Sequence, residues 1–133
     1  MIFKKRKHPL PKFPESVIPT FRQLCEAVES DEAQELIPEV DKCMAHFQRL
    51  KKKHENMNLQ LAYEIADRCR FLLDHYDSFT EEQQSLIMGA VRYFAIADDA
   101  LSETAFASGF HDDAKVMNYV LEELDLLERV IAL

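Results

Sequence analysis

Residues 80–94, with the sequence TEEQQSLIMGAVRYF, carry the clearest helix signal in this chain. Thr80 and Gln83 have the spacing of a capping box, in which the two side chains satisfy free backbone amides at a helix start. The apolar residues that follow recur at helical spacing and are Leu86, Ile87, Ala90, Val91 and Phe94. The pattern predicts a helix with one face in a hydrophobic core.

Other parts of the chain show a similar periodicity, and no run alternates apolar and polar residues with the period of a strand. The spacing predicts further helices over residues 17–28, 30–50, 62–76, 98–108 and 110–127. Ser30 and Asp31 are the expected N-caps of the second of these helices. The sequence therefore predicts an all-α fold, a compact bundle of five to six helices that forms a single domain over residues 15–133.

The last expected helix has a broad apolar face. Gly109 should precede it in the left-handed conformation that ends the helix before. The buried face comprises Phe110, Ala114, Met117, Leu121 and Leu124, widened by Val116, Val120 and Leu127. A face this broad is expected at the centre of the bundle or in a dimer interface.

The first residues differ in composition from the rest of the chain. Prolines are frequent there, and because proline interrupts helices, residues 1–14 are expected to form an extended arm. The arm is basic, with Lys4, Lys5, Arg6 and Lys7. It could contact a membrane surface, an RNA or the acidic surface of another subunit, but we favour a solvated tail without a partner.

The remainder of the chain is strongly acidic. Five of the 16 Lys and Arg residues lie within residues 1–12, so the other 11 face all 24 Asp and Glu residues, and the whole chain has a net charge of −8. An acidic surface repels phosphate backbones, so we expect no sequence-specific binding of nucleic acid.

The three cysteines indicate the compartment. Cys25, Cys43 and Cys69 are widely spaced and odd in number, as in a reducing environment where they act as small buried apolar groups. The N-terminus lacks the apolar stretch of a secretory signal, and no run is long enough to span a bilayer. We expect a cytoplasmic protein.

Several common catalytic motifs are absent from the sequence. With two glycines in the chain, neither a P-loop nor a GxGxxG turn can form, and the sequence contains neither GxSxG nor HExxH. These absences leave no complete catalytic set.

One segment concentrates groups that can bind a cation. It contains Asp98, Asp99, Glu103, His111, Asp112 and Asp113. Carboxylates suit Mg²⁺, Mn²⁺ or Ca²⁺, and a histidine shifts the preference towards transition metals, so the proposed ligands are all of these residues except Asp98. The alternative, which we favour, is that the aspartates cap two helix starts and form ion pairs. His111 with Asp112 is also similar to the pair in metal-dependent HD-type phosphohydrolases, where His75 and Asp125 would have to complete the set.

The same segment resembles a known family. Asp99 with Glu103, then Gly109, Phe110, Asp112 and Asp113, have the order and spacing found in YkvA-like proteins, small bacterial helical domains of unknown function. The resemblance covers about residues 90–124. It implies that this acidic constellation matters in a helical domain, and it implies no particular activity.

Taken together, the sequence predicts a non-enzymatic interaction or scaffold protein that self-associates. The alternative is a divalent-metal site, or a metal-dependent hydrolase-like site, within residues 98–113. Docking of the basic arm on anionic lipid is a third, less favoured hypothesis.

Overall fold

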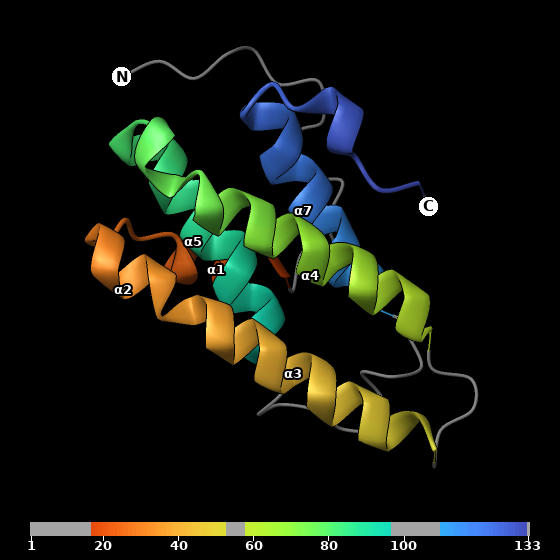
Figure 1. The fold of residues 1–133 in the computed structure, drawn as a ribbon. Helices are drawn as coiled ribbons and strands as arrows, with labels where there is room; N and C mark the ends of the chain where they lie inside the picture. The colour runs from red at the N-terminus through yellow and green to blue at the C-terminus, as the bar shows by residue number, and fades with distance from the viewer. Residues whose placement is uncertain (1–16, 53–57, 97–109, 133) are drawn as a thin grey trace.

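The computed structural model describes residues 17–52, 58–96 and 110–132 (Figure 1). These residues form α1 (Val17–Leu24), α2 (Ser30–Gln34), α3 (Leu36–Lys51), α4 (Leu59–Asp74), α5 (Glu81–Ile96) and α7 (His111–Glu123), with short 3₁₀ turns η2 (Tyr76–Ser78) and η3 (Leu127–Arg129). No strand occurs within them, so the all-α helical bundle is confirmed. The basic arm of residues 1–14 and the helix expected over residues 98–108 lie outside the described residues.

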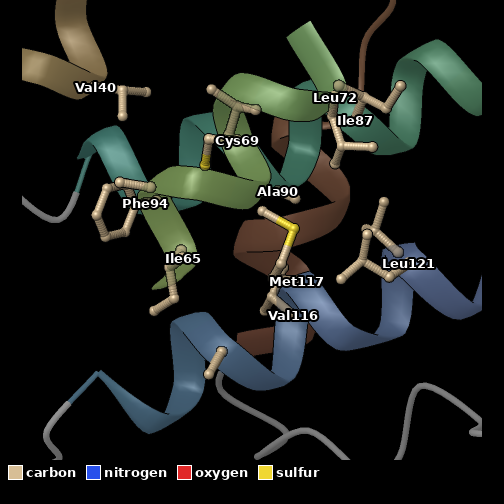
Figure 2. Close-up of a cluster of buried hydrophobic side chains, with 14 of the residues drawn as sticks. Val40, Ile65, Cys69, Leu72, Ile87, Ala90, Phe94, Val116, Met117 and Leu121 are labelled. Atoms are coloured by element: carbon tan, nitrogen blue, oxygen red, sulfur yellow. The ribbon is translucent and has the colours of Figure 1, made fainter. Parts of the chain in front are cut away.

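Helix α5 occupies the centre of the bundle. It contacts α1, α3, α4 and α7, and all five apolar residues predicted to point inwards are buried. Figure 2 shows its Ile87, Ala90 and Phe94 among side chains of α4 and α7. The capping box is confirmed, because the Thr80 N–H donates to Gln83 Oε1 at 2.9 Å and the Gln83 N–H donates to Thr80 Oγ1 at 3.2 Å.

The helix predicted over residues 17–28 is shorter in the structure. It ends at Leu24, and Val28 lies in the connection to α2. The Val28 N–H donates to Tyr76 Oη at 2.8 Å, and the Tyr76 hydroxyl donates to the Val28 carbonyl at 2.7 Å. Because one tyrosine from η2 satisfies both backbone groups, the chain can leave the helix without burying an unpaired amide.

The helix predicted over residues 30–50 is two helices, separated by a turn at Glu35. Pro38 explains the break, since it has no N–H to donate to the Gln34 carbonyl and its ring would clash with that group in a continuous helix. The N-cap prediction was also wrong. Glu29 holds the N-cap position of α2, and the Ser30 hydroxyl donates instead to Asp77 Oδ1 at 2.7 Å.

Three phenylalanines join α3, α5 and α7. The Phe47 ring centroid lies 5.8 Å from that of Phe94 and 4.8 Å from that of Phe110, both at steep angles typical of aromatic contacts. Phe110 has φ 68°, a left-handed conformation that is costly for a bulky residue. Burial of its ring, which is 3% exposed, offsets that cost. The left-handed conformation predicted at Gly109 lies outside the described residues.

The wide apolar face of α7 is buried inside the chain, with one exception. Leu127 is 44% exposed, which corrects its assignment to this face. The helix stops before it in a Schellman motif, where the Leu126 N–H donates to the Leu121 carbonyl at 2.8 Å and Asp125 takes φ 63°. The reversal carries Leu127 away from the helical spacing that predicted its burial.

Gly89 allows α1 to approach α5. A Cβ added there would lie 2.8 Å from Phe21 Cε1 and closer still to Cys25 Sγ. The absence of a side chain at this position therefore sets the separation of the two helices.

Gly89→Ala is expected to destabilise the protein by about 1–3 kcal/mol, although alanine is the better helix former, because α1 must move. Urea unfolding would measure the change. Cys25→Ala in the same chain should restore part of the loss, and two independent, additive effects would contradict this steric explanation.

Candidate functional site

The start of α7 contains the described part of the predicted acidic site. His111 is exposed, Asp112 is half-buried and Asp113 is buried. The remaining sequence-predicted members, Asp98, Asp99, Glu103 and Gly109, lie outside the described residues. Because consecutive residues on a helix point about 100° apart, the three adjacent side chains face different surroundings.

Asp113 is the most unusual of these groups. Its side chain is 9% exposed, and its Oδ1 has no hydrogen-bond partner in the described part of the chain. Burial, together with the negative charge of Asp112, raises the pKa of Asp113 to about 8. The carboxyl group is therefore mostly protonated at neutral pH.

Other weakly acidic groups surround Asp113. Burial raises the pKa of Tyr93 on α5 to about 12, with smaller contributions from Asp113 and Asp112. Burial also raises the pKa of the Cys69 thiol on α4, with Asp113 and Cys43 adding to the effect. Four helices thus bring a carboxyl group, a phenol and two thiols into one buried region.

No activated nucleophile is seen among the described residues of this region. The thiols of Cys43 and Cys69 are buried, and the described part of the chain places no base to remove a proton from Cys69. The Cys43 thiol donates to the Ala95 carbonyl at 3.4 Å. Cys25 is half-buried, and burial raises its pKa to about 11. All three cysteines therefore act as protonated packing groups.

The arrangement supports neither interpretation of the acidic segment in full. Capping does not account for Asp113. The N-cap position of α7 is held by Phe110 without a side-chain hydrogen bond, and Asp113 Oδ1 has no partner among the described residues. Within the same residues, no three His, Cys, Asp or Glu side chains are placed to hold a metal ion. The HD-type set of His75, His111, Asp112 and Asp125 is therefore not assembled.

A groove between α3 and α4 was not predicted from the sequence. It has a volume of about 400 Å³ and an apolar floor that includes Met44, Ala45 and Ala66. Across it, Arg70 forms an ion pair with Asp41, and the Gln48 amide donates to the hydroxyl of Tyr63. Sequence periodicity does not reveal such a groove, because its lining residues come from two helices and combine polar surface residues with the edge of the buried face of each.

Tyr63 is the most accessible aromatic group in the groove. It is 41% exposed, and Leu127 is the other large apolar residue with comparable exposure in the described part of the chain. Exposed tyrosine beside arginine is typical of protein interfaces. The groove is therefore a second candidate site.

Comparisons with known proteins add no relative, since no family model, curated protein or solved structure matches this chain. The candidate sites are thus interpreted from their own geometry. Among the described helices, none has the length and apolar character needed to cross a membrane.

The raised pKa of Asp113 predicts a pH-dependent stability. As pH rises, the unfolded state loses the Asp113 proton near its pKa of 3.8, whereas the folded state keeps the proton up to about pH 8. The stabilisation from this proton is therefore fully present below about pH 4 and is lost as pH rises through about 8. Asp113→Asn should remove this dependence and make the variant relatively more stable above pH 8. Urea unfolding at pH values from about 5 to about 9, with a chelator present, would measure this pH dependence.

The exposed Asp31→Asn on α2 is the matched control and should leave the pH dependence unchanged. Parallel pH profiles for Asp113→Asn and the unsubstituted protein would contradict the inference that the buried carboxyl is protonated.

Proposed function

We propose that this protein is a non-enzymatic interaction domain that self-associates through the outer surface of α3 and α4. The single observation that carries the proposal is the α3–α4 groove with the exposed Tyr63 at its edge. The broad apolar face of α7 gives no support, because it is used inside the bundle.

The charge distribution favours a second copy as the partner. Helices α3 and α4 together carry five acidic and five basic residues, whereas the whole chain has a net charge of −8. Two acidic molecules repel each other least where their surfaces are neutral. Residues 26–35, which precede α3, by contrast contain five acidic residues and no basic one, so that surface opposes association with a copy of itself.

The groove also carries complementary groups within one patch. In a two-fold symmetric dimer the same surface meets itself, so each patch must offer both partners of every contact. Arg70 and Asp67 provide opposite charges, and Tyr63 provides an aromatic group beside an apolar floor. Helices α3 and α4 run antiparallel side by side (Figure 1), and their sixteen residues each extend about 24 Å. Two such pairs can pack as a four-helix layer.

Sedimentation velocity across the micromolar range tests this proposal. The unsubstituted protein should show a concentration-dependent dimer. Tyr63→Ala should weaken the dimer about tenfold or more, because it removes the central aromatic contact, and Arg70→Glu should abolish it by adding like charges.

Arg22→Glu on α1 is the matched control, since it reverses the charge of a similarly exposed arginine elsewhere on the surface. It should leave dimerisation unchanged. A protein that remains monomeric throughout, or a dimer that Arg70→Glu weakens no more than the control does, would refute an α3–α4 interface.

A divalent-cation site is the second candidate. The buried Asp113 Oδ1, which has no hydrogen-bond partner among residues 17–52, 58–96 and 110–132, favours it. Asp112 and Asp113 would provide carboxylate ligands, and Asp99, Glu103 and His111 are further ligands proposed from the sequence. A bound cation would also favour ionised Asp113 by neutralising the charge that burial opposes.

Calorimetric titration with Mn²⁺, Mg²⁺ and Zn²⁺, together with thermal unfolding, tests the cation site. Binding should raise the unfolding temperature of the unsubstituted protein and of Asp31→Asn, but not that of Asp113→Asn. No heat and no thermal shift with any of the three ions would eliminate this candidate.

We further propose membership of the YkvA-like family, supported by the spacing of the acidic motif described above. The described part of that motif, Phe110 to Asp113, begins α7 and includes the buried carboxyl group. Membership would imply a helical domain and no specific reaction.

A further inference from the structure

After α7 the chain turns back on the bundle in a segment that we call the C-terminal strap, residues 126–132 (Figure 1). The turn begins at Leu124 and passes through Asp125, which has φ 63°. From there the strap forms η3 and continues to Ala132 without regular structure. Its contacts with the bundle are specific.

The side chain of Asn118 on α7 binds the backbone of the strap. The Asn118 Nδ2 donates to the Ile131 carbonyl at 3.0 Å, and the Ile131 N–H donates to Asn118 Oδ1 at 2.8 Å. One amide side chain thus satisfies both backbone groups of one residue, as a neighbouring strand would. The Ile131 side chain is 2% exposed and belongs to the hydrophobic core cluster.

Helix α4 binds the strap two residues earlier. The Arg129 guanidinium lies 3.5 Å from the centroid of the Phe71 ring, a cation–π contact. The Arg68 Nε donates to the Arg129 carbonyl at 2.9 Å, while another nitrogen of Arg68 is 3.4 Å from Asp67 Oδ2. Asp67 therefore helps to hold Arg68 in position for the strap.

These contacts define a binding site with a simple recognition pattern. Arg68, Phe71 and Asn118, which we call the strap site, accept a segment that has a cation at the end of a 3₁₀ turn, two residues before a buried aliphatic residue. The hydrogen bonds involve backbone atoms of the segment, so its two anchors, Arg129 and Ile131, provide the selectivity.

We propose that the strap is exchangeable, and that the strap site of one copy takes residues 126–132 of a second copy. The segment with the matching pattern is this chain's own, so a second copy offers a fitted occupant. Exchange is a low-cost route to a dimer, because every strap contact is formed again between copies. The hinge favours opening, since Asp125 would leave the left-handed conformation that is unfavourable for residues with a side chain.

At low concentration the closed form predominates, because the strap of the same chain has an effective concentration in the millimolar range. This inference deepens the proposed self-association by adding a second contact. The strap contacts are made by Arg68, Phe71 and Asn118, none of which lines the α3–α4 groove, so the two contacts can be tested separately at these residues and at Arg70.

Complementation between two full-length variants tests the exchange. Ile131→Asp disables the strap and leaves the strap site intact, whereas Asn118→Ala disables the site and leaves the strap intact. Both chains also carry Arg70→Glu, which eliminates association through α3 and α4. Differently tagged chains are mixed at high concentration and purified through one tag.

The mixture should yield a one-to-one heterodimer, and neither variant alone should dimerise. A mixture without heterodimer would overturn the exchange. If heterodimer formed only in chains that retained Arg70, the association would lie at the α3–α4 surface and the exchange would likewise be refuted.

A synthetic peptide with the sequence of residues 126–132, LLERVIA, provides a second measurement in case a variant folds poorly. By fluorescence anisotropy it should bind the Ile131→Asp chain and not the Ile131→Asp/Asn118→Ala chain. Replacing the peptide's arginine by alanine should weaken binding about 3- to 30-fold through loss of the cation–π contact. Equal binding to both chains, or none to either, would overturn the strap site.

Discussion

Helix α5 contacts four other helices, and the fold depends on its burial. A helix surrounded in this way must be apolar on more than one face, and residues 86–91 are buried without interruption. Its lack of a side chain at Gly89 lets α1 lie close on one side, while Phe94 meets Phe47 on another. The positions of α3, α4 and α7 around this helix then determine which of their polar residues face the core and which face water.

Asp113 and Glu123 are the two charged residues buried in the described part of the chain, and burial has its clearest effect on Asp113. An ionised carboxylate without a partner is expensive to bury, so the group holds a proton instead, and its pKa rises to about 8. Neighbouring Phe110 is held in an unfavourable backbone conformation by its buried ring. The start of α7 thus combines backbone strain at Phe110 with a polar atom, Asp113 Oδ1, that has no partner among the described residues. Proteins retain such features at functional positions more often than elsewhere.

The outer surface is divided by charge. The acidic residues of the α2 region, all exposed, form a surface that repels other acidic molecules, whereas α3 and α4 are neutral as a pair. This division leaves α3 and α4 as one long helical surface without net charge. The C-terminal strap contacts a different part of α4, where Arg68 and Phe71 bind Arg129. Helix α4 therefore links the core, the groove and the strap.

Local sequence determined the helical class, the capping box at Thr80 and the buried faces of α5 and α7, because these depend on spacing within one helix. It did not determine where helices end. Val28 leaves the helical pattern because Tyr76, distant in sequence, satisfies its backbone, and Leu127 is exposed because the chain reverses at Asp125. Within the candidate sites, the sequence singled out His111, Asp112 and Asp113, but it did not indicate which of them is buried. The α3–α4 groove and the strap site form only where separate helices meet, so only the tertiary structure determined their positions. The physical reason is that hydrophobic periodicity shows which face of a helix is buried, and not which other segment covers that face.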